Sequence, residues 1–282
     1  MEECPSPVFI PSADGLETSL PKLAVGLGSR ESTIPKKTLA IGLEFFMKGI
    51  LLAGGTGSRL YPLTKVTNKH LLPVGKKSMI LYPLERLLEC DIRDILIVTG
   101  AKHREDFSHL LGVGEDFHCH FTYKVQEEAG GVAQALGLAE DFVEKEEMMV
   151  ILGDNFFGED LRACARRFRE QKGGTRLILK EVEDPEQFGV AEIKGDRILS
   201  IEEKPSQPKS KFAVTGCYFY GPEVFSIIRN LKPSSRGELE ITDVNKEYIR
   251  RGEAEFDIFQ GWWKDGGTFE SLKRVKELLE QG

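Results

Sequence analysis

Residues 47–64, with the sequence MKGILLAGGTGSRLYPLT, decide the fold class of this chain. The apolar run GILLA is typical of a buried strand, and a glycine-rich turn follows it at once. In open α/β sheets, ligands bind at the carboxyl ends of such strands. Gly54, Gly55 and Gly57 allow backbone N–H groups to approach phosphate oxygens. Arg59 adds a bidentate cation, so the segment predicts an anion-binding turn at a strand end.

This turn differs from the two commonest phosphate-binding loops. It lacks the Gly-Lys-Ser/Thr ending of a Walker A motif. Leu60 occupies the third glycine position of a dinucleotide fingerprint, which disfavours a dehydrogenase. A simple glycine turn would explain neither Arg59 nor Lys69, which follows ten residues later. We therefore expect both cations to act on phosphate groups.

The chain after residue 47 alternates apolar runs with amphipathic segments, the pattern of an α/β fold. Up to residue 182 the alternation predicts a Rossmann-like, mixed and mainly parallel sheet flanked by helices. The expected strands in this part are 49–53, 94–100, 121–125, 148–154 and 175–182, and the expected helices are 80–90, 131–143 and 161–172. Strands at 189–193, 197–203 and 212–220 then predict a small antiparallel insertion beside the main sheet, as a wall for a substrate. Later helices are expected at 221–231, 238–252 and 269–281, with Thr268 as the cap of the last one.

The composition is that of a globular protein. Of 282 residues, 40% are hydrophobic and 29% charged, and there is no apolar run long enough to span a membrane. The net charge of −7 disfavours nucleic acid as a partner, because a phosphate-tracking surface needs a basic face. Five cysteines without a Cys-x-x-Cys pair predict a reduced chain and a cytoplasmic location.

Residues 1–46 differ in composition and in sequence pattern from the rest of the chain. They hold five of the thirteen prolines and show no sustained helical or strand period. We expect either a disordered N-terminal extension or a mis-assigned start, with translation beginning at Met47. Residues 47–282 are expected to form one continuous domain.

Two acids are candidates for metal binding. Asp154, in LGDN, ends a buried apolar strand, where a carboxylate is costly unless it meets a cation. Mg²⁺ shared with nucleotide phosphates is the usual cation at such a place, and a helix cap is the alternative. Asp265, in WWKDGGT, would be a turn aspartate if taken alone. Paired with Asp154, it becomes a second Mg²⁺ ligand.

Two further motifs suggest substrate contacts. In EEKP, Glu203 offers a carboxylate for sugar hydroxyls and Lys204 an ammonium for a phosphate, although adjacent strand residues usually face opposite ways. In VQEEAGG, Gln126 is able to pair with a base edge, and Gly130 and Gly131 leave space for a flat ring. The blander interpretations are a surface ion pair and a strand-to-helix turn.

Nine elements in order resemble the glucose-1-phosphate thymidylyltransferases of the sugar-phosphate nucleotidyltransferase family. They are LAGGTGSRLYPLT, NKHLLPV, VQEEAGGVAQAL, LGDN, FGVAEI, EEKP, FAVTGCYFY, RGELEITDVN and WWKDGGT. The resemblance implies a Rossmann-like nucleotidyltransferase fold. It also implies Mg²⁺-assisted, in-line transfer of a thymidylyl group from dTTP to glucose 1-phosphate, giving dTDP-glucose and pyrophosphate.

The resemblance also implies the site residues. Arg59, Lys69 and Lys204 would be catalytic, with Arg59 and Lys69 neutralising the departing pyrophosphate, and Asp154 and Asp265 would hold Mg²⁺. The implied nucleotide-binding residues are Leu52, Gly54, Gly55, Gly57, Ser58, Gln126 and Gly131. The implied sugar-phosphate-binding residues are Gly189, Glu203, Lys204, Val214, Tyr218 and Arg236.

Some choices within the family stay open. Phe188 stands where Tyr is frequent, which bears on sugar selectivity, and the chain resembles the short form of the family, so we expect weak or absent feedback by the end product. A UTP-dependent or other sugar-1-phosphate nucleotidyltransferase is the nearest alternative, and a non-catalytic nucleotide-sugar sensor is a more distant one. Assembly into a homo-oligomer is left open.

Overall fold

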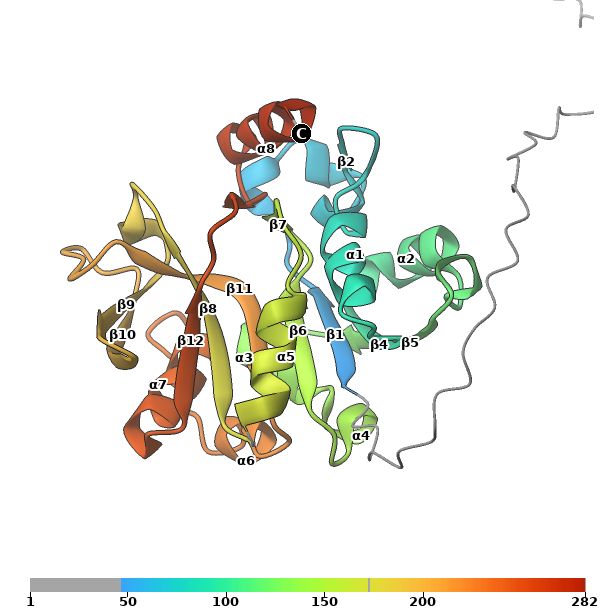
Figure 1. The fold of residues 1–282 in the computed structure, drawn as a ribbon. Coiled ribbons are helices and arrows are strands. Elements are labelled where there is room, and N and C mark those ends of the chain that lie inside the picture. The colour runs from blue at the N-terminus through green and yellow to red at the C-terminus, as the bar shows by residue number, and fades with distance from the viewer. Residues whose placement is uncertain (1–46, 172, 282) are drawn as a thin grey trace, which may run out of the picture. The chain divides into compact units, whose positions relative to one another are not determined.

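The computed structural model describes residues 47–171 and 173–281, so the expectations for residues 1–46 lie outside the described residues. A nine-stranded mixed sheet forms the centre, with helices on both faces (Figure 1). Its strands run in the order β10-β9-β11-β6-β1-β4-β5, and β8 joins β11 to β12. The predicted Rossmann-like α/β fold is therefore confirmed.

The parallel half of the sheet carries the first glycine turn. β1 (Lys48–Ala53) lies between β4 (Asp94–Gly100) and β6 (Met148–Leu152), and β5 (His120–Gln126) pairs with β4. All these pairs are parallel, so their carboxyl ends meet at one edge. The carboxyl end of β1 therefore lies at the same edge of the sheet as the carboxyl ends of β4, β5 and β6.

Alternating side chains of β1 build two hydrophobic cores, one on each face of the sheet. Leu51 and Ala53 join the core under α1 (Leu81–Glu89), α2 (Arg104–Leu111) and α5 (Arg162–Gln171). Ile50 and Leu52 join the opposite core. The helices packed there are α3 (Val132–Gly137), α4 (Glu140–Val143), α6 (Val224–Ile228) and α7 (Ile241–Arg251). Both faces of β1 are thus buried, as its continuous apolar sequence requires.

The antiparallel insertion continues the main sheet and does not lie beside it, which corrects the expectation. β9 (Gly189–Lys194) and β10 (Arg197–Glu203) form a hairpin. β11 (Phe212–Tyr220) pairs with β9 through its first residues and with β6 through its last ones. It also runs antiparallel to β8 (Thr175–Glu181), with a register break between Val214 and Tyr218. One bent strand therefore links the insertion to the parallel half.

Several short elements were not predicted from the sequence. β12 (Ala254–Ile258) extends the sheet parallel to β8, and β13 (Trp263–Asp265) pairs with β7 (Asn155–Phe157). A small hairpin joins β2 (Pro73–Val74) to β3 (Lys77–Ser78). The 3₁₀ helices are η1 (Ser58–Leu60), η2 (Leu63–Lys65), η3 (Lys69–Leu71), η4 (Ala101–His103), η5 (Glu115–Phe117) and η6 (Pro185–Gln187).

The last helix, α8 (Phe269–Gln281), packs beside β2 at the top of Figure 1. Its Val275 is fully buried in a third core with Val74 and Phe156. The predicted Thr268 cap is confirmed, because the Ser271 backbone N–H donates to Thr268 Oγ1 at 3.1 Å.

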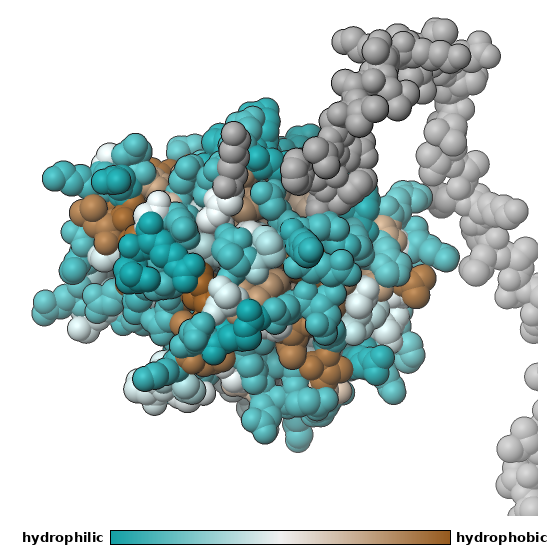
Figure 2. Space-filling model, turned by 90° about the horizontal axis from the view of Figure 1, so that it is seen from below, coloured by the Kyte–Doolittle hydropathy of each residue, from teal (hydrophilic) through white to brown (hydrophobic). Residues whose placement is uncertain are grey.

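The surface is predominantly polar on the face that Figure 2 shows, where hydrophobic residues gather only in small groups. Across the described ranges, no helix has the length and apolar character that a membrane crossing demands.

Candidate active site

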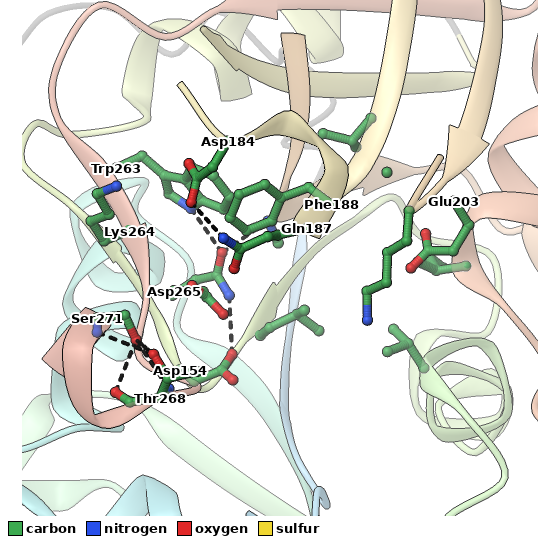
Figure 3. A pocket seen from close by; sticks show the side chains of 18 of the residues that line it. Asp154, Asp184, Gln187, Phe188, Glu203, Trp263, Lys264, Asp265, Thr268 and Ser271 are labelled. Atoms are coloured by element: carbon green, nitrogen blue, oxygen red, sulfur yellow. Dashed lines mark hydrogen bonds between the residues drawn. The ribbon is translucent and has the colours of Figure 1, made fainter. Parts of the chain in front are cut away.

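A cavity of about 700 Å³ opens at the edge where the parallel strands end. It is bounded by the end of β6, the β9–β11 insertion, β13, the start of α7 and one face of α8. The sequence-predicted residues that line it are Arg59, Asp154, Gly189, Glu203, Lys204, Val214, Tyr218, Arg236 and Asp265. Figure 3 shows Asp154 and Asp265 on one side of this cavity and Glu203 on the other.

The β7–β13 ladder brings the two candidate metal ligands together. Asp265 is paired with Asn155, the residue after Asp154. The Gly266 backbone N–H also donates to the Asp154 carbonyl at 2.6 Å. Two acids far apart in sequence therefore meet because a three-residue strand fixes their register.

The two carboxyls differ in how their charge is balanced. Burial alone would raise the pKa of Asp154, but the adjacent Lys69 ammonium, which forms an ion pair with it, holds that pKa well below its usual range. Burial, reinforced by the charge of Asp154, raises the pKa of Asp265. Within the described ranges, no side chain forms a hydrogen bond or ion pair with the Asp265 carboxylate. Asp265 thus has no ion-pair partner among the described residues, although the charges of Arg59 and Lys69 partly offset the effect of burial.

These two acids fit Mg²⁺. Hard oxygen ligands are what this ion prefers, and it usually takes one or two carboxylates from the protein and further oxygens from substrate phosphates and water. The described part of the chain has no cluster of three or more His, Cys, Asp or Glu side chains that could hold a metal ion. A buried acid beside a second acid, with its pKa still raised, is a place where a further cation lowers the free energy.

Arg59 lies beside this pair. A Cβ atom added to Gly267 would lie 2.8 Å from Arg59 Nη2 and 2.9 Å from Asp265 Oδ2. A side chain at this position would therefore displace the guanidinium or the carboxylate. The predicted cation and the predicted metal ligand therefore share one corner of the cavity.

Lys69 is held against the first glycine turn. Its Cγ and Cβ atoms would lie 3.4 Å and 3.0 Å from a Cβ added to Gly57, whose φ of +66° also favours glycine. The next residue, His70, is buried against Asn68, and burial lowers its pKa to about 3. His70 is therefore neutral at pH 7, and it is the sequence neighbour of Lys69, which forms an ion pair with Asp154.

The predicted base-binding residues form a separate group outside the lining of this cavity. The Gln126 amide donates to the Gly131 carbonyl at 3.2 Å, and its Oε1 atom lies where a side chain at Gly54 would be, 2.3 Å from an added Cβ. At both glycines, the space that a side chain would take is occupied. The Leu239 backbone fills it at Gly131, and the Gln134 side chain fills it at Gly130. The other predicted nucleotide-binding residues belong to β1 and the segment after it. Leu52 is in β1, Gly55 is in the turn that follows, and Ser58 begins η1.

On the opposite wall, Glu203 and Lys204 both line the cavity, although they are neighbours in sequence. Lys204 follows the end of β10 and has a φ of +46°, which turns the chain so that both side chains face the same space. The Lys204 N–H donates to the Phe188 carbonyl at 2.9 Å, which fixes this turn. The alternation expected for a strand therefore ends before Lys204.

Polar neighbours hold the groups of this wall. Thr242 Oγ1 donates to Glu203 Oε2 at 2.5 Å, and Arg236 donates to Glu240 Oε2 at 2.8 Å. Arg236 Nη2 also lies 3.8 Å from Glu203 Oε1. Tyr218 is buried, which raises the pKa of its hydroxyl. The wall thus presents Glu203 and Arg236, whose side chains are held by hydrogen bonds, together with the Lys204 side chain.

Sequence reasoning missed several residues of this site. Asn155 Nδ2 donates to Asp154 Oδ1 at 3.0 Å, and its Oδ1 atom accepts from Gly216 N at 2.9 Å and from Trp263 Nε1 at 2.8 Å. Thr242 supports Glu203, as described above. The LGDN, WWKDGG and ITDVN segments contain these residues, but nothing in the sequence shows which side chains meet.

Comparisons with known proteins agree with this architecture. The family model for nucleotidyl transferases matches residues 48–282. A glucose-1-phosphate thymidylyltransferase from Neisseria meningitidis is 43% identical over 238 residues, covering 83% of both chains. One from Mycolicibacterium smegmatis is 44% identical over 237 residues, covering 83% of this chain and 82% of the relative.

Solved structures show the same fold. A Bacillus anthracis protein assigned as a glucose-1-phosphate thymidylyltransferase, solved in complex with a sucrose, superposes with a TM-score of 0.80 at 56% identity. The match covers 82% of this chain and 94% of that one. A UDP-glucose pyrophosphorylase at 24% identity has a TM-score of 0.75 and supports the fold alone. The chain belongs to the nucleotidyl transferase family.

Proposed function

We propose that this chain transfers the thymidylyl group of dTTP to glucose 1-phosphate, giving dTDP-glucose and pyrophosphate. The observation that carries the proposal is the position of Asp154 and Asp265. Together with Arg59 they line a cavity whose far wall offers Glu203 and Lys204, and Lys69 forms an ion pair with Asp154. The names of the relatives at 43–44% identity support dTTP and glucose 1-phosphate as the substrates.

The geometry suits a single displacement. A phosphate oxygen of the sugar phosphate attacks the α-phosphorus, a new P–O bond forms, and the bond to the β-phosphate breaks with its electron pair leaving on pyrophosphate. Such a reaction needs alignment and charge stabilisation more than covalent chemistry. Lys204 and Arg236 would hold the sugar phosphate, while Arg59 and Lys69 would stabilise the departing pyrophosphate.

We propose Mg²⁺ as the cofactor, with Asp154 and Asp265 as its protein ligands. When bound, it would neutralise phosphate charge at the reacting centre. Lys69 forms an ion pair with Asp154 in the structure, so it is free to turn to a phosphate once another cation balances that acid. Glu203 would accept hydrogen bonds from sugar hydroxyls, with its orientation fixed by Thr242.

We also propose a reducing, cytoplasmic setting. Cys90, Cys119, Cys164 and Cys217 are all free thiols. Burial raises the pKa of Cys90 and of Cys164 to about 12, which keeps both thiols protonated and unreactive. Cell fractionation tests this location, and recovery of the chain with secreted proteins would contradict it.

A pyrophosphate-release assay tests the proposed reaction. It crosses dTTP, UTP, CTP and ATP with several sugar 1-phosphates in the presence of Mg²⁺. We expect the highest kcat/KM with dTTP and glucose 1-phosphate, with UTP the strongest competitor. One methyl group separates thymine from uracil, which is worth about 1–3 kcal/mol in a pocket. Release with UTP alone would replace the thymidylyl assignment, and release with no pair would favour a sensor.

A further inference from the structure

The backbone of Leu239 contacts the turn that precedes α3. Its N–H donates to the Gly130 carbonyl at 2.8 Å, and its carbonyl accepts from Ala133 N at 3.1 Å. Gly131 lies between these two hydrogen bonds with a φ of +100°. A Cβ atom added to Gly131 would lie 2.4 Å from the Leu239 carbonyl oxygen, so a side chain would force the two backbones apart.

The turn is also tied to the nucleotide side of the site. Gln126 Nε2 donates to the Gly131 carbonyl at 3.2 Å and to Gln134 Oε1 at 2.7 Å. The Oε1 atom of Gln126 packs against Gly54 in the first glycine turn. A shift of Gly131 would therefore move the amide that is expected to read the base.

Leu239 is tied equally closely to the sugar-phosphate side. The next residue, Glu240, accepts hydrogen bonds from Arg236 at 2.8 Å and from Ser234 Oγ at 2.7 Å. Glu240 also precedes α7, whose Thr242 donates to Glu203. Leu239 thus lies in the same short segment as Glu240 and Thr242, the side chains that hold Arg236 and Glu203.

We propose that Gly131 and the Leu239 backbone are positioning residues that couple the nucleotide half of the site to its sugar-phosphate half. The inference rests on the proposed function, which assigns Gln126 to the nucleotide and Arg236 and Glu203 to the sugar phosphate. A turn that served only as a base contact would not need this close approach to Leu239. Through this coupling, the affinity for the sugar phosphate depends on Gly131, which lies in the turn before α3 on the nucleotide side of the site.

Steady-state kinetics of Gly131→Ala test this dependence. We expect the KM for glucose 1-phosphate to rise about tenfold, the factor that corresponds to the net loss of one hydrogen bond. Gly137→Ala is the matched control, because it adds the same methyl group within α3, where the nearest atom would be 3.4 Å away. A Gly131→Ala variant in which only the KM for dTTP rises would overturn the coupling and leave a simple base contact.

A second pair of variants separates the backbone of Leu239 from its side chain. Both Leu239→Ala and Leu239→Pro replace the leucine side chain. Only the proline variant also removes the backbone N–H that donates to the Gly130 carbonyl. We expect Leu239→Pro to raise the KM for glucose 1-phosphate well beyond the effect of Leu239→Ala. Equal effects of the two variants would contradict the proposal.

Hydrogen–deuterium exchange of the wild-type chain tests the coupling without any substitution. Adding dTTP alone should slow amide exchange in residues 234–242, which lie on the sugar-phosphate side. Unchanged exchange there, with slowed exchange in the first glycine turn, would overturn the inference. A wild type that binds dTTP but forms no product with glucose 1-phosphate would refute the proposed function instead. The kinetic comparison would then use the substrate pair that the wild type accepts.

Discussion

At the scale of single residues, the two acids of the site have opposite effects on folding. The folded-state pKa of Asp154 is depressed by Lys69, so its ionised form stabilises the fold. The folded-state pKa of Asp265 is raised by burial and by Asp154, so its ionised form opposes folding. In the metal-free chain, the ionised Asp265 therefore costs folding free energy, as expected for the Mg²⁺ site that we propose.

Asp265→Asn should therefore stabilise the metal-free chain while removing activity. The amide keeps the shape but carries no charge, so folding at pH 7 no longer confines an unbalanced carboxylate. We expect a higher urea midpoint in the presence of a chelator, and a loss of about 10² to 10³ in turnover. A lower midpoint than wild type would show that Asp265 is already balanced in the folded chain.

Asp154→Asn should have the opposite effect on stability. Its contribution is present above the ordinary carboxyl pKa and is lost as the pH falls through the lower folded-state value. The variant should be less stable than wild type at pH 7, and the difference should shrink as the solution becomes acidic. Urea denaturation across this acid range provides the measurement, and a difference independent of pH would refute the ion-pair account.

At the scale of elements, short strands and helix caps fix the positions of the residues that line the cavity. α8 begins at Phe269, two residues after Gly267, and Arg59 and Asp265 both lie close to that glycine. Its N-terminus is held by reciprocal hydrogen bonds between Thr268 and Ser271. The cap thus fixes the position of one wall of the cavity as well as the helix.

Thr268→Ala should lower the free energy of unfolding by about 1 kcal/mol, the usual cost of losing a helix cap. Thr268→Ser keeps the oxygen that accepts from Ser271 N and serves as the control. Chemical denaturation of the two variants compares them directly. Equal stabilities would mean that the hydroxyl does not contribute to the cap.

The longer elements of this fold could be predicted from the sequence because their own residues encode them. Continuous apolar runs indicated β1, β4 and β6, and helical periodicity indicated α1 and α5. β13 was missed because three residues are too few to show a period, and β12 because its side chains are mostly half-exposed. The expected helix at 131–143 is divided into α3 and α4.

The charged residues of the candidate site could be predicted from the sequence, because a buried charge is costly unless an opposite charge lies nearby. Arg59, Lys69, Asp154 and Asp265 were each identified in sequence. The β7–β13 ladder explains why the two acids lie together, and an ion pair joins Lys69 to Asp154. Asn155 and Thr242 could not be predicted, because their importance lies in hydrogen bonds to residues far away in the chain. The Leu239 contact at Gly131 likewise depends on tertiary packing.

At the scale of the whole molecule, the net charge of −7 contrasts with the anionic substrates that we propose for the site. In this proposal, phosphate recognition comes from the local cations Arg59, Lys69, Lys204 and Arg236, and not from the overall field. The mixed sheet makes this possible. Its parallel half carries the glycine turn, and its antiparallel half carries the opposite wall of the cavity.

Product analysis by mass spectrometry tests the central claim most directly. The purified chain is incubated with dTTP, glucose 1-phosphate and Mg²⁺, and a parallel sample contains the folded Asp154→Asn variant. Our account predicts dTDP-glucose and pyrophosphate in equal amounts from the wild type, with formation reduced about 10²-fold or more in the variant. Absence of dTDP-glucose from the wild type, or equal formation by the variant, would contradict it.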